Sequence, residues 1–261
     1  MDLADKDLSE ALSAAAGRAG KRAYVRQIFS EIAPRYDLLN HLLSFNIDRS
    51  WRRLAIAELG WEGRPEATYL DLCAGTLDVG NELARTPGFR GHVVSADFAE
   101  PMVRAGRAKT RGVALSPIIG DTQELPLAVS TAAGAIVAFG VRNLADLDAG
   151  LREMHRVLAS GARLVILEFS TPPSVLVRGI YHSYFHILLP VVGRLVSGHP
   201  TAYRYLPESV ARFPTEHALV QRMEDAGFSN VRWRRLSFGI AAIHVGEKLQ
   251  AAMQLEPGEN R

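Results

Sequence analysis

The chain has 261 residues, enough for one large α/β domain with additions or for two small domains. A hydrophobic content of 48% supports a full core, and a net charge of +2 without a dense basic stripe gives no reason to expect nucleic acid. The single cysteine, Cys73, excludes an internal disulfide and is typical of a reducing compartment. The first residues are acidic where a signal peptide would be basic, and no apolar stretch reaches the roughly 20 residues of a spanning helix. We therefore expect a cytoplasmic protein.

The first part of the chain divides into two segments. Residues 1–20 are rich in alanine, aspartate, serine and glycine and lack an apolar period, so we expect a flexible tail. Residues 21–60 carry a helical pattern that Pro34 interrupts, and they predict a helical cap. We expect residues 21–261 to form a single catalytic domain that includes this cap.

From Ala67 onward, short apolar strands alternate with helices. The predicted strands span 68–73, 91–97, 113–119, 134–139 and 163–169, and the predicted helices span 79–84, 101–109, 144–158 and 218–226. Two closing strands, 230–235 and 238–245, are joined tightly enough to form an antiparallel hairpin. The alternation predicts a mostly parallel, Rossmann-like sheet of seven strands with helices on both faces.

Residues 174–210 break this rhythm and are expected to form an internal lid. The segment is rich in tyrosine, histidine, leucine and valine and is more apolar than an ordinary loop. Lining a channel for a lipid tail, resting on a bilayer surface, packing on the main domain and forming a homodimer interface all fit this composition. His182 and His186 are spaced four residues apart, but without a third ligand they predict no metal site.

Three acidic residues stand at the ends of three successive predicted strands. Asp71 ends the first strand just before Gly75, Asp97 ends the second, and Asp121 follows the third together with Thr122. In an open α/β sheet a ligand binds beyond the carboxyl ends of the strands, where carboxylates accept hydrogen bonds from ribose hydroxyls and from an adenine amino group. The arrangement predicts a nucleoside site, although Asp97 is also placed to cap the following helix.

The glycine turn indicates a ligand without phosphates. A dinucleotide site wants G-x-G-x-x-G, so that a pyrophosphate approaches the start of a helix, but here the turn has Gly75 followed by Leu77. No G-x-x-x-x-G-K-[ST] motif occurs either. A nucleoside that contacts the protein through ribose and adenine fits better than NAD or ATP.

Several separated blocks of the sequence are similar to those of one known family. They are Tyr36-Asp37-x-x-Asn40 with Ser44 and Trp51, Asp71 to Asp78, Phe139-Gly-Val-Arg-Asn143, Arg156-Val-Leu, Leu167-Glu-Phe-Ser170 and Tyr203-Arg-Tyr-Leu. From about Tyr24 to Val245 the chain resembles the ubiquinone/menaquinone biosynthesis C-methyltransferases. The resemblance implies the fold of class I S-adenosylmethionine-dependent methyltransferases, S-adenosylmethionine as methyl donor and a lipid-tailed quinol as acceptor, with the protein at most peripheral to the inner face of the membrane.

The same resemblance assigns donor-binding residues. Thr76, Asp97, Asp121 and Thr122 are implied to bind S-adenosylmethionine, and the strand-end pattern adds Asp71 and Gly75. Family members usually have glycine where this chain has Leu77, and a branched side chain there would crowd the donor or tilt the turn. This departure leaves open a non-catalytic binding or scaffold subunit.

Methylation of a quinol ring carbon needs a nucleophilic carbon. A phenolate supplies it, because its charge delocalises onto the ortho carbon, so the site must stabilise an oxyanion. Arg142 and Asn143 follow the fourth predicted strand. Arg142 is a candidate to stabilise the phenolate, directly or through a water, and Asn143 is a candidate to orient the ring hydroxyl. Tyr36 of the cap is a candidate for contact with the quinol or the donor.

Each candidate also has a structural alternative. In the alternative for Arg142, the side chain is a solvated charge or the partner of Asp146 in a salt bridge. In the alternatives for the other two, Asn143 caps the long helix and Tyr36 is a buried structural tyrosine. The sequence leaves the acceptor open between a naphthoquinol, a benzoquinol and another small molecule with an oxygen or nitrogen nucleophile.

Overall fold

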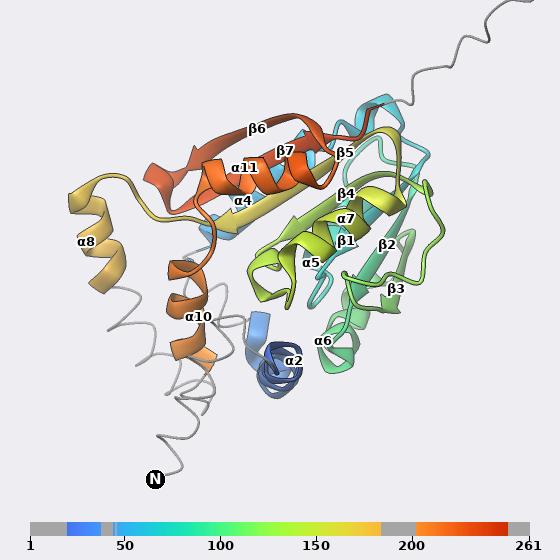
Figure 1. The fold of residues 1–261 in the computed structure, drawn as a ribbon. Coiled ribbons are helices and arrows are strands. Elements are labelled where there is room, and N and C mark those ends of the chain that lie inside the picture. The colour runs from blue at the N-terminus through green and yellow to red at the C-terminus, as the bar shows by residue number, and fades with distance from the viewer. Residues whose placement is uncertain (1–19, 38–43, 45, 184–201, 250–261) are drawn as a thin grey trace, which may run out of the picture.

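The computed structural model describes residues 20–37, 44, 46–183 and 202–249. Its centre is a seven-stranded sheet with the order β3-β2-β1-β4-β5-β7-β6 (Figure 1). The strands are β1 (Thr68–Leu72), β2 (His92–Asp97), β3 (Leu115–Ile119), β4 (Ala132–Ala138), β5 (Leu158–Phe169), β6 (Ser229–Leu236) and β7 (Ala241–Glu247). Strands β1 to β5 pair in parallel, and β7 is antiparallel to both of its neighbours. This confirms the predicted mostly parallel sheet with an antiparallel hairpin at its end.

Helices cover the sheet and extend beyond one of its edges (Figure 1). The α-helices are α2 (Lys21–Ile32), α4 (Ile47–Glu58), α5 (Asp78–Ala84), α6 (Glu100–Gly106), α7 (Leu147–Val157), α8 (Val175–Ser183), α10 (Ala202–Ala211) and α11 (Glu216–Asp225). Short 3-10 turns are η1 (Ala33–Arg35), η2 (Trp61–Gly63), η3 (Arg107–Thr110), η4 (Val141–Asn143) and η6 (Ser237–Gly239). None of the described helices is long and apolar enough to cross a membrane.

The alternation of side chains along each strand produces two apolar layers. Leu164 and Ile166 of β5 pack in one layer, which includes residues of α7 and α11. Val165 and Leu167 pack in the other layer, with residues of α4, α5 and α6. All four side chains are fully buried, and each contributes about 1.5–3 kcal/mol of hydrophobic stabilisation. Because helices cover both faces of the sheet, a ligand most easily reaches it from the ends of the strands. The carboxyl-end edge, by which we mean the side of the sheet where the parallel strands end, is available for a ligand.

Several element boundaries differ from the sequence-based expectation. Strand β5 begins at Leu158, because that residue pairs with Ala132 before the register shifts to Gly134 and Arg163. The second closing strand begins only at Ala241, because η6 precedes it. The predicted cap helices are confirmed as α2 and α4, with η1 at the proline. The predicted tail, apart from residue 20, and lid residues 184–201 lie outside the described residues.

The long helix after β4 is capped by a different residue from the one considered above. Asn143 lies in η4, and α7 begins only at Leu147. Its N-cap is Asp146, whose Oδ1 accepts a hydrogen bond from the amide of Ala149 at 2.9 Å. Asn143 therefore does not cap the helix, and its side chain is available for another contact.

The turn between β1 and α5 bends through Leu77, which has φ of 66° and ψ of 20°. This left-handed conformation costs a residue with a Cβ about 1–2 kcal/mol, and it explains why glycine suits the position. The Leu77 side chain is fully buried in the apolar layer with α4, α5 and α6. It therefore packs into the core, where its burial offsets the cost of the backbone conformation.

Replacement of Leu77 by glycine is expected to lower the free energy of unfolding by about 2 kcal/mol. The loss of a buried leucine costs about 3 kcal/mol or more, and relief of the left-handed conformation returns about 1 kcal/mol. Urea denaturation measures the difference, with Leu77→Ala as the matched variant that loses the packing but keeps the backbone cost. A glycine variant more stable than the natural protein would show that Leu77 contributes no packing energy.

Candidate active site

A cavity opens at the carboxyl-end edge of the sheet, beneath the cap. It encloses about 610 Å³, including the part open to solvent. Of the nine residues expected at the site, six line it: Tyr36, Gly75, Asp97, Asp121, Thr122 and Asn143. The turns after β1, β2, β3 and β4 all contribute to the lining, as parallel strands require, and α2 contributes from the cap.

Asp97 ties two of these turns together. Its Oδ2 accepts a hydrogen bond from the amide of Gly75 at 2.9 Å, and its Oδ1 accepts one from the amide of Ala99 at 2.8 Å. Burial of the carboxyl raises its pKa, and the backbone amides that bind the ionised form act against this. Each carboxylate oxygen still has a lone pair for a ligand hydroxyl. The N-cap of α6 is Ala99, and no side chain caps this helix. Asp97 therefore shapes the turn before α6 and is not its N-cap residue.

Gly75 lets a ligand approach the backbone of the first turn. Its φ is 53°, in the left-handed region, and a Cβ there would lie 3.3 Å from Cε of Met102 and 3.9 Å from Cε1 of Tyr36. Phe98 and Met102, which follow Asp97 along the chain, add apolar lining beside this turn. The cavity thus places a left-handed glycine without a Cβ and a buried carboxylate next to an apolar surface. This combination is suited to a nucleoside.

Asp121 and Thr122 occupy the third turn. Oδ2 of Asp121 lies 2.7 Å from Nε of Arg22, which reaches down from α2. Thr122 is buried, and its hydroxyl lies 3.4 Å from Sγ of Cys73. Burial raises the pKa of the Cys73 thiol, so it remains protonated and is not a nucleophile. Sequence reasoning missed Arg22, because nothing in the spacing along the cap shows which of its charged residues faces the cavity.

Asp71 occupies a different position from the expected one. It is fully buried and does not line the cavity. Its Oδ2 accepts hydrogen bonds from the amide of Gly80 at 2.9 Å and from the hydroxyl of Ser95 at 3.2 Å. A Cβ on Gly80 would lie 2.3 Å from that hydroxyl oxygen, so only glycine fits. Asp71 therefore fixes the start of α5 against the sheet, and burial raises its pKa to about 7.

Thr76 also lies away from the cavity lining. It is buried, and its hydroxyl donates a 2.5 Å hydrogen bond to Oδ1 of Asp37, just after η1 of the cap. The other oxygen of Asp37 contacts the ammonium of Lys109. The first turn is therefore attached to the cap through Thr76 and Lys109.

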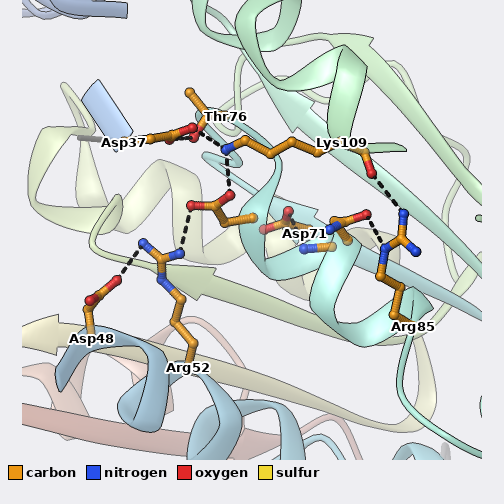
Figure 2. Close-up of polar contacts among 10 residues, drawn as sticks. Asp37, Asp48, Arg52, Asp71, Thr76, Arg85 and Lys109 are labelled. Atoms are coloured by element: carbon orange, nitrogen blue, oxygen red, sulfur yellow. Dashed lines mark hydrogen bonds and ion pairs between the residues drawn. The ribbon is translucent and has the colours of Figure 1, made fainter. Parts of the chain in front are cut away.

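The same lysine begins a chain of ion pairs that runs to α4 (Figure 2). Nζ of Lys109 lies 2.6 Å from Asp78, which pairs with Arg52 at 2.8 Å, and Arg52 pairs with Asp48 at 3.1 Å. Burial opposes ionisation of Asp78, but Arg52 and Lys109 together lower the pKa of that carboxyl. Figure 2 shows how this alternating series joins the cap, α5 and α4 next to the first turn.

Arg142 forms a buried ion pair, though not with the expected partner. Its Nη1 lies 2.8 Å from Oε1 of Glu168, and both side chains are more than nine-tenths buried. The same nitrogen donates to the carbonyl of Phe139, and the backbone oxygen of Arg142 accepts from Nζ of Lys21 at 2.9 Å. The pair with Asp146 considered above is therefore wrong. Arg142 lines a neighbouring hollow and not the cavity itself.

Asn143 presents its amide to the cavity from η4. Its Oδ1 accepts a hydrogen bond from the hydroxyl of Tyr205 at 3.2 Å, so α10 of the lid reaches the site. Burial raises the pKa of Tyr205 to about 12, which keeps the hydroxyl a donor. No described residue accepts from Nδ2 of Asn143, so this group remains a donor for a ligand. Tyr36 lines the same cavity and packs edge-to-face on Phe29, with ring centroids 6.0 Å apart.

The described residues contain no group of three or more His, Cys, Asp or Glu side chains that would hold a metal ion. His186 lies outside the described residues, and nothing is described of the His182 side chain. The expectation of a site without metal stays a prediction.

An open sheet in which only β7 is reversed, with a glycine turn after β1 and carboxylates after β2 and β3, defines a class I S-adenosylmethionine-dependent methyltransferase. The chain belongs to the ubiE/COQ5 methyltransferase family, whose model matches residues 18–248.

Relatives of known name resemble nearly the whole chain. A demethylmenaquinone methyltransferase of Thermus thermophilus is 49% identical over 85% of this chain and 100% of its own. A protein of Geobacter sulfurreducens named ubiquinone/menaquinone biosynthesis C-methyltransferase UbiE is 45% identical over 86% of this chain and 88% of its own. The demethylmenaquinone methyltransferase of Deinococcus radiodurans is 44% identical over 86% of this chain and 92% of its own.

Solved structures agree on the fold. An S-adenosylmethionine-dependent methyltransferase of Thermotoga maritima matches with a TM-score of 0.57 at 18% identity, over 86% of this chain and 99% of its own. Phosphoethanolamine N-methyltransferase 2 of Haemonchus contortus, solved with S-adenosylmethionine, matches with a TM-score of 0.53 at 10% identity, over 71% of this chain and 49% of its own. At these identities the likeness shows the fold alone.

The raised pKa of Asp71 predicts how stability changes with pH. Because folding raises the pKa of this carboxyl, its contribution is complete below the unfolded pKa of about 3.9 and is lost as the pH rises towards and through about 7. Between pH 5 and pH 7, the natural protein should lose about 2 kcal/mol more stability than Asp71→Asn, which cannot ionise. Urea denaturation at the two pH values measures this, and an equal change in both proteins would contradict the assignment.

Proposed function

We propose that this protein transfers a methyl group from S-adenosylmethionine to a ring carbon of a lipid-tailed quinol, with demethylmenaquinol as the preferred acceptor. The observation that carries the proposal is the cavity itself, which is lined by the carboxylates Asp97 and Asp121 and by Asn143, whose Nδ2 donates to none of the described residues. Membership of the ubiE/COQ5 family supports the reaction, and relatives named demethylmenaquinone methyltransferase support the acceptor.

The cavity residues fit the donor. Asp97 retains acceptor capacity for ribose hydroxyls, and Asp121 with Thr122 supplies polar groups for an adenine edge. Phe98 provides an apolar surface, and Gly75 leaves the backbone approachable. When bound, S-adenosylmethionine supplies an electrophilic methyl group on a sulfonium. The protein's task is then to hold an acceptor carbon in line with that group.

The acceptor reacts as a phenolate, so the site must favour negative charge on a ring oxygen. Nδ2 of Asn143 is the group we assign to this oxyanion, because its amide is already oriented by Tyr205. Tyr36 of the cap lines the same cavity, and we assign to it a contact with the ring or the donor. Both side chains are held by packing or hydrogen bonds before the substrate arrives, which reduces the cost of organising the site.

In this scheme Arg142 is a positioning residue for the turn that carries Asn143. Its guanidinium is bound to Glu168 and to the carbonyl of Phe139, so it fastens the turn that carries Asn143 to the end of β5. Burial raises the pKa of Glu168, whereas the charge of Arg142 favours the ionised form of that carboxyl. This role differs from the stabilisation of the phenolate, directly or through a water, that is expected from the sequence.

Methyl transfer from labelled S-adenosylmethionine to reduced demethylmenaquinone in detergent tests the proposal, with the oxidised quinone as control. Product from the quinol alone is expected, because only the quinol forms a phenolate. A demethylated benzoquinol is the second acceptor to test, since the Geobacter relative is named for both pathways. Donor binding without product from either quinol would contradict the proposed acceptor class, and absence of donor binding would favour a non-catalytic role.

Asn143→Ala is expected to lower kcat about 100-fold while changing the donor Kd little. Removal of one donor to a developing oxyanion typically costs this much, and the contacts assigned to the donor lie on other turns. Tyr205→Phe is the matched variant, because it keeps the amide but removes the hydrogen bond that orients it, and an intermediate loss is expected. Steady-state kinetics and calorimetric titration separate the two effects. A normal kcat in Asn143→Ala would contradict the role of its amide.

A further inference from the structure

Four large apolar side chains are exposed near the edge of the sheet that carries the cavity. Phe238 is 83% exposed, Val175 and Leu176 are each 75% exposed, and Ile47 is 44% exposed. They come from η6, the start of α8 and the start of α4, three segments distant in sequence. We name these four residues the apolar edge. Exposed apolar side chains gathered in this way are typical of an interaction surface.

Specific contacts bring the three segments together. Strand β7 is reversed, so the turn from β6 to β7 lies at the same edge as the carboxyl ends of the parallel strands. Nε1 of Trp51 in α4 donates to the hydroxyl of Ser237 at 3.0 Å. The hydroxyl of Ser170 donates to the carbonyl of Gly239 at 2.8 Å, which holds the segment leading into α8 against the turn. Figure 1 shows the start of α8 and the β6–β7 turn at the same end of the molecule.

Phe238 stands out because its backbone is unfavourable for an aromatic residue. Its φ is 59° and its ψ is 19°, the left-handed region that glycine and asparagine tolerate best. A phenylalanine that is 83% exposed gains little from burial in this protein to offset that conformation. An external apolar partner would supply the missing burial.

The charge around the apolar edge is positive. Arg49 and Arg178 are exposed beside it. Among residues 46–50, 171–183 and 236–240 there is one acidic residue, Asp48. That aspartate is buried and paired with Arg52, so it does not oppose an anionic partner. Apolar side chains flanked by arginines complement a bilayer that contains anionic lipids.

An aromatic cluster connects the apolar edge to the cavity. Trp51 lies against Phe139, with ring centroids 6.2 Å apart, and Phe139 lies against Phe169 at 4.7 Å. Phe139 also lines the cavity. Packed aromatic rings therefore lie between the β6–β7 turn and the cavity, an apolar environment that is compatible with a lipid-tailed molecule.

We propose that the apolar edge is a membrane-docking surface that rests on an anionic phospholipid bilayer and admits the quinol from it. This proposal rests on the proposed function, because it supplies the route by which a lipid-tailed acceptor reaches the cavity. It assigns the insertion into the bilayer chiefly to Phe238.

Sedimentation of the full-length protein with vesicles of equal parts phosphatidylglycerol and phosphatidylcholine tests the proposal. The variant is Phe238→Asn, which removes the aromatic ring but tolerates the left-handed backbone, so its melting temperature should not fall. The matched control is Val129→Asn, because Val129 is 64% exposed but precedes β4 at the opposite edge of the sheet. We expect Phe238→Asn to weaken vesicle binding about tenfold or more and Val129→Asn to leave it unchanged.

Two further arms identify the lipid charge and the substrate route. Vesicles of phosphatidylcholine alone, or the variant Arg178→Gln, should bind several-fold more weakly. Phe238→Asn should lose activity on a long-tailed quinol in vesicles yet keep it on a short-tailed, water-soluble quinol. Equal vesicle binding by the natural protein and Phe238→Asn would overturn the proposal.

The remaining outcomes separate this proposal from others. If the natural protein binds vesicles through Phe238 but methylates no quinol, the proposed function fails and the docking surface stands. If analytical ultracentrifugation shows a dimer that Phe238→Asn converts to monomer, and vesicle binding is absent, the apolar edge is a contact between two copies and the proposal is overturned.

Discussion

The carboxylate of Asp97 holds the candidate site together. It accepts hydrogen bonds from the backbone amides of Gly75 and Ala99, and these bonds fix the turn after β1 against the turn after β2. Both hydrogen bonds are made to a charged acceptor with little exposure to water, which makes them stronger than bonds between neutral groups. Gly75 belongs to the first of these turns, and Phe98, which follows Asp97, gives the second turn its apolar lining. These hydrogen bonds organise two of the turns that line the cavity before any ligand binds.

Around this centre, charge and apolar surface have separate tasks. The ion pairs from Asp37 through Lys109 and Asp78 to Arg52 attach the cap and α4 to the turn that follows β1. The aromatic rings of Trp51, Phe139 and Phe169 pack against one another, and Phe139 among them lines the cavity. A site that combines ion pairs with aromatic packing suits the proposed reaction between a charged nucleoside and a lipid-tailed acceptor.

The sequence predicted the sheet, the cap and most of the strand-end residues, because those features follow from local patterns. Asp97, Asp121 and Asn143 were placed by the rule that ligands bind beyond the carboxyl ends of parallel strands. Asp71 fits the same pattern, but its carboxylate binds the amide of Gly80 and does not line the cavity. The direction of a side chain at a strand end depends on packing, which the sequence pattern does not contain.

Other features depended on contacts between distant residues. Glu168 is 26 positions from Arg142, and Tyr205 is 62 positions from Asn143, so neither pairing has a local signal. The orientation of the Leu77 side chain could not be predicted from the sequence either. Its backbone is left-handed, as for a glycine, and its side chain fills a space in the apolar layer that is formed only when distant elements pack together.

The most direct test of this account is a calorimetric titration of S-adenosylhomocysteine into the natural protein and into Asp97→Asn. The account predicts that the asparagine variant binds about 100-fold more weakly, because it loses charge-assisted acceptors for the ribose hydroxyls. Thermal denaturation without ligand shows whether the variant is folded. A folded variant with the affinity of the natural protein would contradict the claim that this carboxylate organises the donor site.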